Sequence, residues 1–341
     1  MRLSFVLVCL LALFSACSNN NKNPDVSGIK VALRTERFEE GLFNLDKANF
    51  SAELDKLQAK YPSFGENFIY TVLNADPRWN QDSVAAYVNK FTKDYRSIFD
   101  SSQLVFKDFS PYEKEIKKGF QYLKYYFPAY KLPQKIITYI GPVDGIGIIL
   151  SDDILGVGLQ LHLGKNFSIY RSELVQQTYP AYISSQFEPG NIAVNSVKNI
   201  LLDIFPEKMD DKTLVHQMVQ KGKRLFLLQK ILPWVDEYKL TGYTEEQMKG
   251  CYKNEMEIWN LFIKNNLLQS IDNNLIKNYI GPSPKTPELV DDEGKFAPGN
   301  IGSFVGWQIV KKYMAKNPDL SLQQLMQQDD EIVFSEAKYK P

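Results

Sequence analysis

The stretch KIITYIGPVDGIGIILSDDILGVGLQLHL, residues 135–163, differs in composition from the segments on either side of it. It is rich in Ile, Val, Leu and Gly, and turn-forming residues interrupt it at Gly141-Pro142 and at 151–153. Residues 159–163 alternate between apolar and polar side chains, which is typical of a half-buried strand. These features predict two or three strands that form a small sheet.

Helical patterns lie on both sides of this stretch. One helix face is formed by apolar residues three or four positions apart, Val84, Val88, Phe91, Tyr95 and Ile98. Ser110-Pro111 begins another helix, which runs to Phe127. Later helices are expected over about 190–204, 211–230, 245–268, 301–316 and 321–327.

The domain begins with a strand signal, because Ile29, Val31 and Leu33 alternate with polar neighbours. No internal repeat and no interdomain linker follow. The sequence therefore predicts one α+β domain over 29–341, mostly helical and with a small β-sheet.

The first 16 residues have the layout of a secretory signal. Arg2 is followed by an apolar run, 3–14, that is too short to span a bilayer, and Ser15-Ala16 precede Cys17. A cysteine at this point is typical of a bacterial lipoprotein signal, in which Cys17 becomes the acylated N-terminus. Phe14 stands where such signals more often carry Leu. The alternative is an ordinary cleaved signal with an incidental cysteine.

Acylation of Cys17 would hold the protein on a membrane, because each buried methylene contributes about 0.8 kcal/mol and two or more chains anchor stably. The segment 17–28, polar at its start, would then be a flexible tether between the lipid and the domain. No acidic cluster follows the cysteine. We expect the protein to face the periplasm from an envelope membrane, the outer one rather than the inner one.

Charge and cysteine content exclude some classes of partner. The whole chain has 40 basic and 40 acidic residues, and loss of the signal removes only Arg2, which leaves 39 against 40 and a net charge of −1. No basic surplus remains to attract nucleic acid or anionic lipid, so neither is expected as a partner. Cys251 is the one cysteine beyond the signal and the acylation site, so an apolar core rather than a disulfide must hold the fold.

The predicted helix over 211–230 contains His216-Gln217-Met218-Val219-Gln220. Zincin-type zinc peptidases place His, Glu and His at the first, second and fifth positions of such a segment, so that both imidazoles bind one zinc and the Glu activates its water. Here two of those positions are carboxamides, which neither take up a proton nor bind zinc well. His216 is therefore a weak metal candidate, and hydropathy places it with Gln220 on a solvated helix face.

Glu255 lies in the middle of the apolar stripe of the predicted helix 245–268. A carboxylate in that place leaves water and needs a cation, a metal or a proton. Thermolysin-like zincins take a third zinc ligand from a Glu on a later helix, which makes Glu255 a second weak metal candidate. Because two zinc-site positions are glutamines, we favour a structural ion pair between Glu255 and Lys223 or Arg224. On this interpretation the protein has no cofactor, and zinc is not expected.

Two other features have structural interpretations. His162 falls on the polar side of the alternating run 159–163, where we expect it to be hydrogen-bonded or solvated. Gly302 and Gly306 lie in the predicted helix 301–316, and their spacing is typical of a helix that packs closely against another.

Taken together, the chain resembles the gliding-motility lipoprotein GldB family of the Bacteroidetes over nearly the whole mature length. Short motifs occur in order: Arg37-Phe38-Glu39, Leu42-Phe43, Tyr61-Pro62, Gly222-Lys223, Leu232-Pro233, Gly242-Tyr243-Thr244, Asn254-Glu255 and Ile258-Trp259. The closing motifs are the most specific: Ile301-Gly302, Gly306-Trp307-Gln308-Ile309-Val310, Tyr313-Met314 and Tyr339-Lys340-Pro341. The resemblance implies a degenerate zincin-like fold without an intact metal motif and an association with gliding. It identifies no catalytic residue.

The leading hypothesis is a non-catalytic, membrane-anchored envelope lipoprotein. Its partners would be the membrane, through the N-terminal lipid, and other envelope or gliding-machinery proteins. One alternative is a zinc-dependent metallohydrolase or peptidase in which His216, Glu255 and a further carboxylate hold the metal. Another is a ligand-binding lipoprotein for sugars or peptides.

Overall fold

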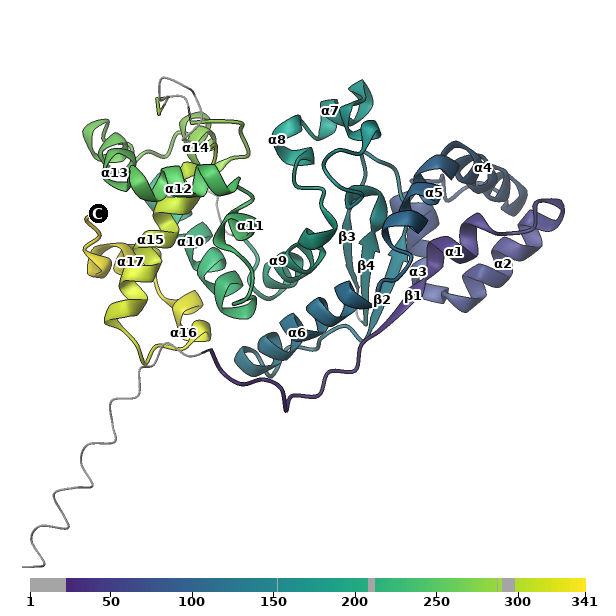
Figure 1. The fold of residues 1–341 in the computed structure, drawn as a ribbon, viewed down its shortest axis with the longest axis horizontal. Coiled ribbons are helices and arrows are strands. Elements are labelled where there is room, and N and C mark those ends of the chain that lie inside the picture. Colours follow the sequence, from purple (N-terminus) through teal and green to yellow (C-terminus); the bar gives the residue numbers. More distant parts are fainter. Residues whose placement is uncertain (1–22, 152, 208–211, 287, 290–297) are drawn as a thin grey trace, which may run out of the picture.

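Four short strands form one mixed sheet in the computed structural model, which describes residues 23–151, 153–207, 212–286, 288–289 and 298–341 (Figure 1). The strands are β1 Arg34–Arg37, β2 Lys135–Tyr139, β3 Ile148–Ser151 and β4 Ile154–Gly158. Their order is β1-β2-β4-β3, with β1, β2 and β4 parallel and β3 antiparallel to β4. Three of them lie within 135–163, so the prediction of a small sheet there is confirmed.

Two strand predictions were misplaced. Residues 29–33 precede β1, whose pairing with β2 begins at Arg34 opposite Lys135. Residues 159–161 form a 3-10 helix instead of a strand, and all three are buried. The Tyr170 hydroxyl donates to the Gln160 carbonyl at 2.7 Å and accepts from the Leu163 amide at 3.0 Å, so a side chain bonds backbone groups that a neighbouring strand would otherwise bond.

The remaining elements are mostly helices. Around the sheet lie α1 Phe38–Phe43, α2 Phe50–Lys60, α3 Pro62–Asn67, α4 Gln81–Asp94, α5 Arg96–Val105, α6 Ser110–Tyr126, α7 Glu173–Thr178, α8 Ala181–Ser184 and α9 Ile192–Ile204. The C-terminal part contains α10 Leu214–Ile231, α11 Glu237–Thr241, α12 Glu245–Lys253, α13 Glu255–Lys264, α14 Asn273–Ile280, α15 Ile301–Lys316, α16 Leu322–Gln327 and α17 Asp330–Ala337. The prediction of a mostly helical α+β domain is confirmed.

The apolar face expected over 84–98 belongs to two helices rather than one. The chain leaves α4 at Tyr95, where φ is −99° and ψ is 8°, and α5 follows. The Tyr95 ring stacks on Phe91 with 4.4 Å between ring centroids, and its hydroxyl accepts from the Val143 amide at 3.4 Å. The break therefore lets Tyr95 connect the helical region to the loop after β2.

The helices α10 and α15 pack against each other at backbone distance. A Cβ atom on Gly306 would lie 1.8 Å from the Met218 carbonyl oxygen, and one on Gly222 would lie 2.2 Å from the Gly306 carbonyl carbon. Such distances leave no room for any side chain other than hydrogen. Residues 301–310 of α15 are all buried, so the close helix packing expected from Gly302 and Gly306 is confirmed.

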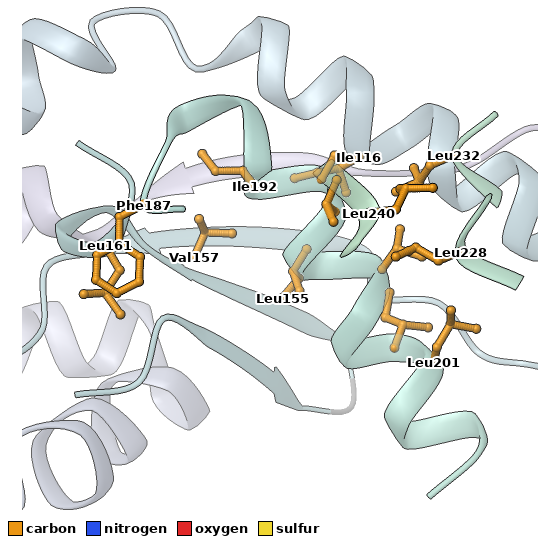
Figure 2. Packing of buried hydrophobic residues seen from close by; sticks show 14 of the residues in the cluster. Ile116, Leu155, Val157, Leu161, Phe187, Ile192, Leu201, Leu228, Leu232 and Leu240 are labelled. Atoms are coloured by element: carbon orange, nitrogen blue, oxygen red, sulfur yellow. The ribbon is translucent and has the colours of Figure 1, made fainter. Parts of the chain in front are cut away.

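One hydrophobic core connects the sheet to the C-terminal helices. Figure 2 shows part of this core, with Leu155 of β4, Ile116 of α6, Leu201 of α9 and Leu228 of α10. Because these elements share one core, the sheet and the helical part form a single packed unit. No helix in the described part of the chain is both long and apolar enough to cross a membrane.

Candidate functional site

The residues that suggested a zinc site lie on α10. Its N-terminal turn follows Thr213, whose hydroxyl is hydrogen-bonded to His216 Nδ1 at 2.6 Å. Gln217 is buried and donates from Nε2 to the Lys212 carbonyl at 3.0 Å. Gln220 donates from Nε2 to Asp330 Oδ2 at 3.0 Å. Glutamines therefore occupy the two positions at which zincins carry the catalytic Glu and the second His. Both glutamine side chains are hydrogen-bonded to other residues of this chain.

The α10 face that carries His216 and Gln220 is partly covered, and both residues are half-buried. Lys223, one turn further along, is buried with 3% of its side chain exposed. Its ammonium donates to Asp330 Oδ1 at 2.7 Å and to the Gln328 carbonyl at 2.6 Å. We call this contact between Gln220, Lys223 and Asp330 the α10–α17 junction. Hydropathy did not predict this partial cover, because the covering residue, Asp330, comes more than 100 positions later in the sequence.

The cations proposed as partners of Glu255 have other partners. Lys223 pairs with Asp330, and Arg224 lies 3.7 Å from Glu207. Glu255 itself is partly exposed at the first position of α13 and accepts a hydrogen bond from the Tyr339 hydroxyl at 2.6 Å. Burial and this bond raise the pKa of Tyr339 above its usual value.

Glu255 does not occupy the middle of a helix because the expected helix over 245–268 is interrupted. The helix α12 ends at Lys253, Asn254 has φ −112° and ψ 23°, and α13 begins at Glu255. The first helix does start as its sequence indicates, with a capping box between Thr244 and Gln247.

Three side chains that could hold a metal ion do come together beside the α10–α17 junction. Within the described residues, ligand atoms of His216, Asp329 and Glu331 all lie within 4.8 Å of one another. Asp329 also caps α17, because its Oδ1 accepts from the Glu331 amide at 2.9 Å and the Ile332 amide at 3.2 Å. These bonds lower the pKa of Asp329, with a smaller contribution from His216. The sequence interpretation missed Asp329 and Glu331, although Asp-Asp-Glu before an apolar run is a recognisable helix start.

A zinc site of the zincin kind does not fit these residues. Gln217 and Gln220 are already bonded to Lys212 and Asp330, and Glu255 bonds Tyr339. The buried ammonium of Lys223 pairs with Asp330 and also acts electrostatically on Asp329. It would repel a second cation bound there.

His162 is a buried structural residue. It is 1% exposed, and its Nδ1 lies 2.9 Å from the Gly158 carbonyl while its Nε2 lies 3.2 Å from Asn195 Nδ2. Burial lowers the pKa of His162 to about 4, so the ring is neutral near pH 7. The expectation of a hydrogen-bonded His162 is confirmed.

A second buried ion pair lies beside the sheet and was not anticipated. Glu39 is fully buried and accepts from Arg37 Nε at 2.5 Å and from the Thr138 hydroxyl at 2.7 Å. Arg37 also donates from Nη1 to the Phe106 carbonyl at 2.9 Å. Burial raises the pKa of Glu39, and the Arg37 charge opposes that rise. This pair ties β1 and α1 to β2, which gives the Arg37-Phe38-Glu39 motif a structural role.

Comparison with known proteins gives one match. The family model described as gliding motility protein GldB matches residues 19–341. Neither the comparison with curated proteins nor the comparison with solved structures gives a significant match. Since the family model covers nearly the whole chain, the chain belongs to the gliding motility protein GldB family.

Proposed function

We propose that this protein is a lipid-anchored, periplasm-facing component of the cell envelope that supports gliding motility by binding other envelope proteins. The observation that carries the proposal is family membership over residues 19–341. The lipoprotein-type signal ending at Cys17 supports the anchor, although that segment lies outside the described residues. We place the protein on the outer membrane rather than the inner one.

We further propose that the protein has no catalytic site and no zinc cofactor. Support comes from Gln217 and Gln220, which stand where a zincin has its general base and its second zinc ligand. Both amides are bonded to other parts of the chain. A surface that binds partners needs neither residue type.

The anchor is tested by complementation in a gliding host that lacks the gene. Wild-type protein should restore spreading, whereas Cys17→Ala should not restore it, because the unacylated chain cannot remain on the membrane. Cys9→Ala, the same substitution inside the predicted signal, is the matched control and should restore spreading. Membrane fractionation of the three proteins separates loss of anchoring from loss of expression. Normal spreading with soluble Cys17→Ala protein would contradict the proposal.

A zinc-dependent metallohydrolase is the second candidate, favoured by the grouping of His216, Asp329 and Glu331. Elemental analysis of the purified protein decides between the two. If this group holds zinc, near-stoichiometric metal should disappear in Glu331→Gln and remain in Glu336→Gln, an exposed glutamate on the same helix. A folded, metal-free wild-type protein would exclude the second candidate.

A further inference from the structure

A cavity of about 220 Å³ lies between α9, α10, α11 and the first turn of α15. Pockets for drug-sized ligands are larger, about 300–1,000 Å³. The cavity therefore fits a small ligand or the head end of a longer one. It lies on a different face of α10 from the α10–α17 junction, as the helix positions that line it indicate.

Two helices present the same combination of side chains to this cavity. On α9, Lys198 stands beside Leu201 and Leu202, at spacings of three and four residues. On α10, Lys221 and Arg224 stand above Leu225 and Leu228 in the same way. Residues at these spacings share a helix face, so each helix contributes basic groups together with leucines. Figure 2 shows Leu201 and Leu228 within the core that forms the apolar side of the cavity.

The basic groups exceed the acidic groups at the cavity. Three basic side chains line it, and Glu207 is the one described carboxylate among the lining residues. Glu207 Oε1 lies 3.9 Å from Lys221 Nζ and 3.7 Å from Arg224 Nη1. Both distances are longer than those of a charge-assisted hydrogen bond, which are about 2.7–2.9 Å. One loosely placed carboxylate cannot neutralise three cations.

Two of these basic groups retain unused hydrogen-bonding capacity. Arg224 donates from Nη2 to the Phe205 carbonyl at 3.0 Å, but its buried Nε has no partner among the described residues. Burial alone lowers the pKa of Lys198 to about 8, and no described carboxylate offsets it. Buried polar groups are normally satisfied, so the buried and unpaired Arg224 Nε, next to the half-buried ammonium of Lys198, favours an anion in this cavity.

The first turn of α15 adds to this preference for negative charge. Asn300 and Ser303 line the cavity, and α15 begins at Ile301. The amino end of a helix carries a partial positive charge, which favours an anion near it.

From these observations we propose that this cavity, hereafter the basic cavity, binds an anionic headgroup, phosphate or carboxylate, that is attached to a short apolar chain. Lys198, Lys221 and Arg224 contact the anion. Leu201, Leu225 and Leu228 contact the apolar part. The same chemistry occurs in a free amphiphilic acid and at the headgroup of an anionic lipid.

The first test is calorimetric titration of the chain from residue 18 onward, which contains every described residue, with octyl phosphate and octanoate. Saturable binding of either anion is expected, with much weaker binding of the neutral octyl glucoside. Lys198→Met should weaken anion binding about tenfold or more, since it removes an ionic hydrogen-bond donor. Lys230→Met, a similarly buried lysine of α10 that does not line the cavity, is the matched control and should bind as wild type does.

A second variant should change the anion affinity in the opposite direction. Glu207→Gln removes the carboxylate that competes for Lys221 and Arg224, so it should tighten anion binding several-fold. No saturable binding of either anion, equal binding of octyl glucoside, or wild-type affinity in Lys198→Met would overturn the proposal. Thermal unfolding of each variant confirms that it is folded.

A second experiment distinguishes the two sources of the anion. Cosedimentation of the same protein is measured with vesicles of phosphatidylglycerol and with vesicles of phosphatidylcholine. Selective binding to phosphatidylglycerol that octyl phosphate displaces, and that Lys198→Met loses, would support a lipid headgroup. Binding of octyl phosphate without binding to vesicles would support a free amphiphilic acid.

Discussion

Helix α10 presents basic side chains to two regions, and their charges are balanced differently. At the α10–α17 junction, Lys223 is 3% exposed and bonds both Asp330 and the Gln328 carbonyl. In the basic cavity, the buried Nε of Arg224 on α10 has no partner among the described residues, and half-buried Lys198 of the neighbouring α9 has no described carboxylate partner. A buried charge that the chain itself satisfies supports the fold. A basic group at a cavity whose hydrogen-bonding capacity the chain leaves unused favours the binding of an anionic ligand.

The largest expected effect comes from disrupting the close packing of α10 against α15, because α10 contributes to both regions. In Gly306→Val the Cβ alone would lie 1.8 Å from the Met218 carbonyl oxygen, so α10 and α15 must separate. We expect destabilisation of about 4 kcal/mol or more, measured by urea unfolding, with the junction and the cavity lost together. Gly190→Ala is the control, because a Cβ there meets nothing within 4 Å. A stable Gly306→Val protein would mean that the helix pair is not so closely packed.

The next effect separates the two regions. Asp330→Ala leaves the Lys223 ammonium buried and unpaired, which should destabilise the protein by about 3–5 kcal/mol. Glu336→Ala, an exposed carboxylate on the same helix, should change the unfolding free energy by less than about 0.5 kcal/mol. The double variant Lys223→Met, Asp330→Leu should recover much of the loss, since it removes both charges. A small effect for Asp330→Ala would place the junction outside the stabilising core.

In the basic cavity, removal of one charged side chain should raise the free energy of unfolding instead of lowering it. Burial lowers the pKa of Lys198 from 10.5 to about 8, so below pH 8 the folded state contains a desolvated ammonium. Lys198→Met should therefore stabilise the ligand-free protein at pH 7, by about 1–2 kcal/mol after allowance for partial exposure.

This gain depends on pH in a defined direction. It should shrink as the pH rises from about 8 towards 10.5, because wild-type Lys198 then loses its proton. The comparison of wild type and variant by urea unfolding at pH 7 and pH 10 cancels the titration of distant groups, whereas Lys221, Arg224 and Glu207 line the same cavity and are coupled to Lys198. A destabilised variant at pH 7 would mean that Lys198 is satisfied within the chain.

The smallest effect concerns the hydrogen bond between Tyr339 and Glu255. Tyr339→Phe removes the hydrogen bond to Glu255 but keeps the ring against Trp259, whose centroid lies 5.0 Å away. We expect a loss of about 1 kcal/mol in unfolding free energy. Tyr125→Phe, at an exposed tyrosine, is the control and should have no measurable effect. A much larger loss would show that Glu255 depends on this hydroxyl for its place in the fold.

Local patterns in the sequence predicted local structure well. The composition of 135–163 predicted a small sheet of two or three strands, and Gly302 and Gly306 predicted close helix packing. Features that depend on distant partners were missed. The strand β1 has the polar sequence Arg-Thr-Glu-Arg and is a strand because it pairs with β2.

The candidate site shows the same limit. A pair between Glu255 and Lys223 or Arg224 was expected on the basis of a continuous helix. That helix breaks at Asn254, and Glu255 instead accepts a hydrogen bond from Tyr339. The partner of Lys223, Asp330, comes 107 residues later. Lys198 gave no signal at all, since a lysine beside leucines on a helix is ordinary until the surrounding elements enclose it.

The parallel pairing of β1 with β2 has a consequence for the order of assembly. Residues 135–158 can form β2, β3 and β4 from neighbouring sequence, whereas Arg34 must find Lys135 across about a hundred intervening residues. Closing a loop of that length opposes pairing by about 4 kcal/mol in chain entropy. The strand β1 is therefore expected to join the sheet last. It is synthesised before the other three strands but can pair only after β2 has been made.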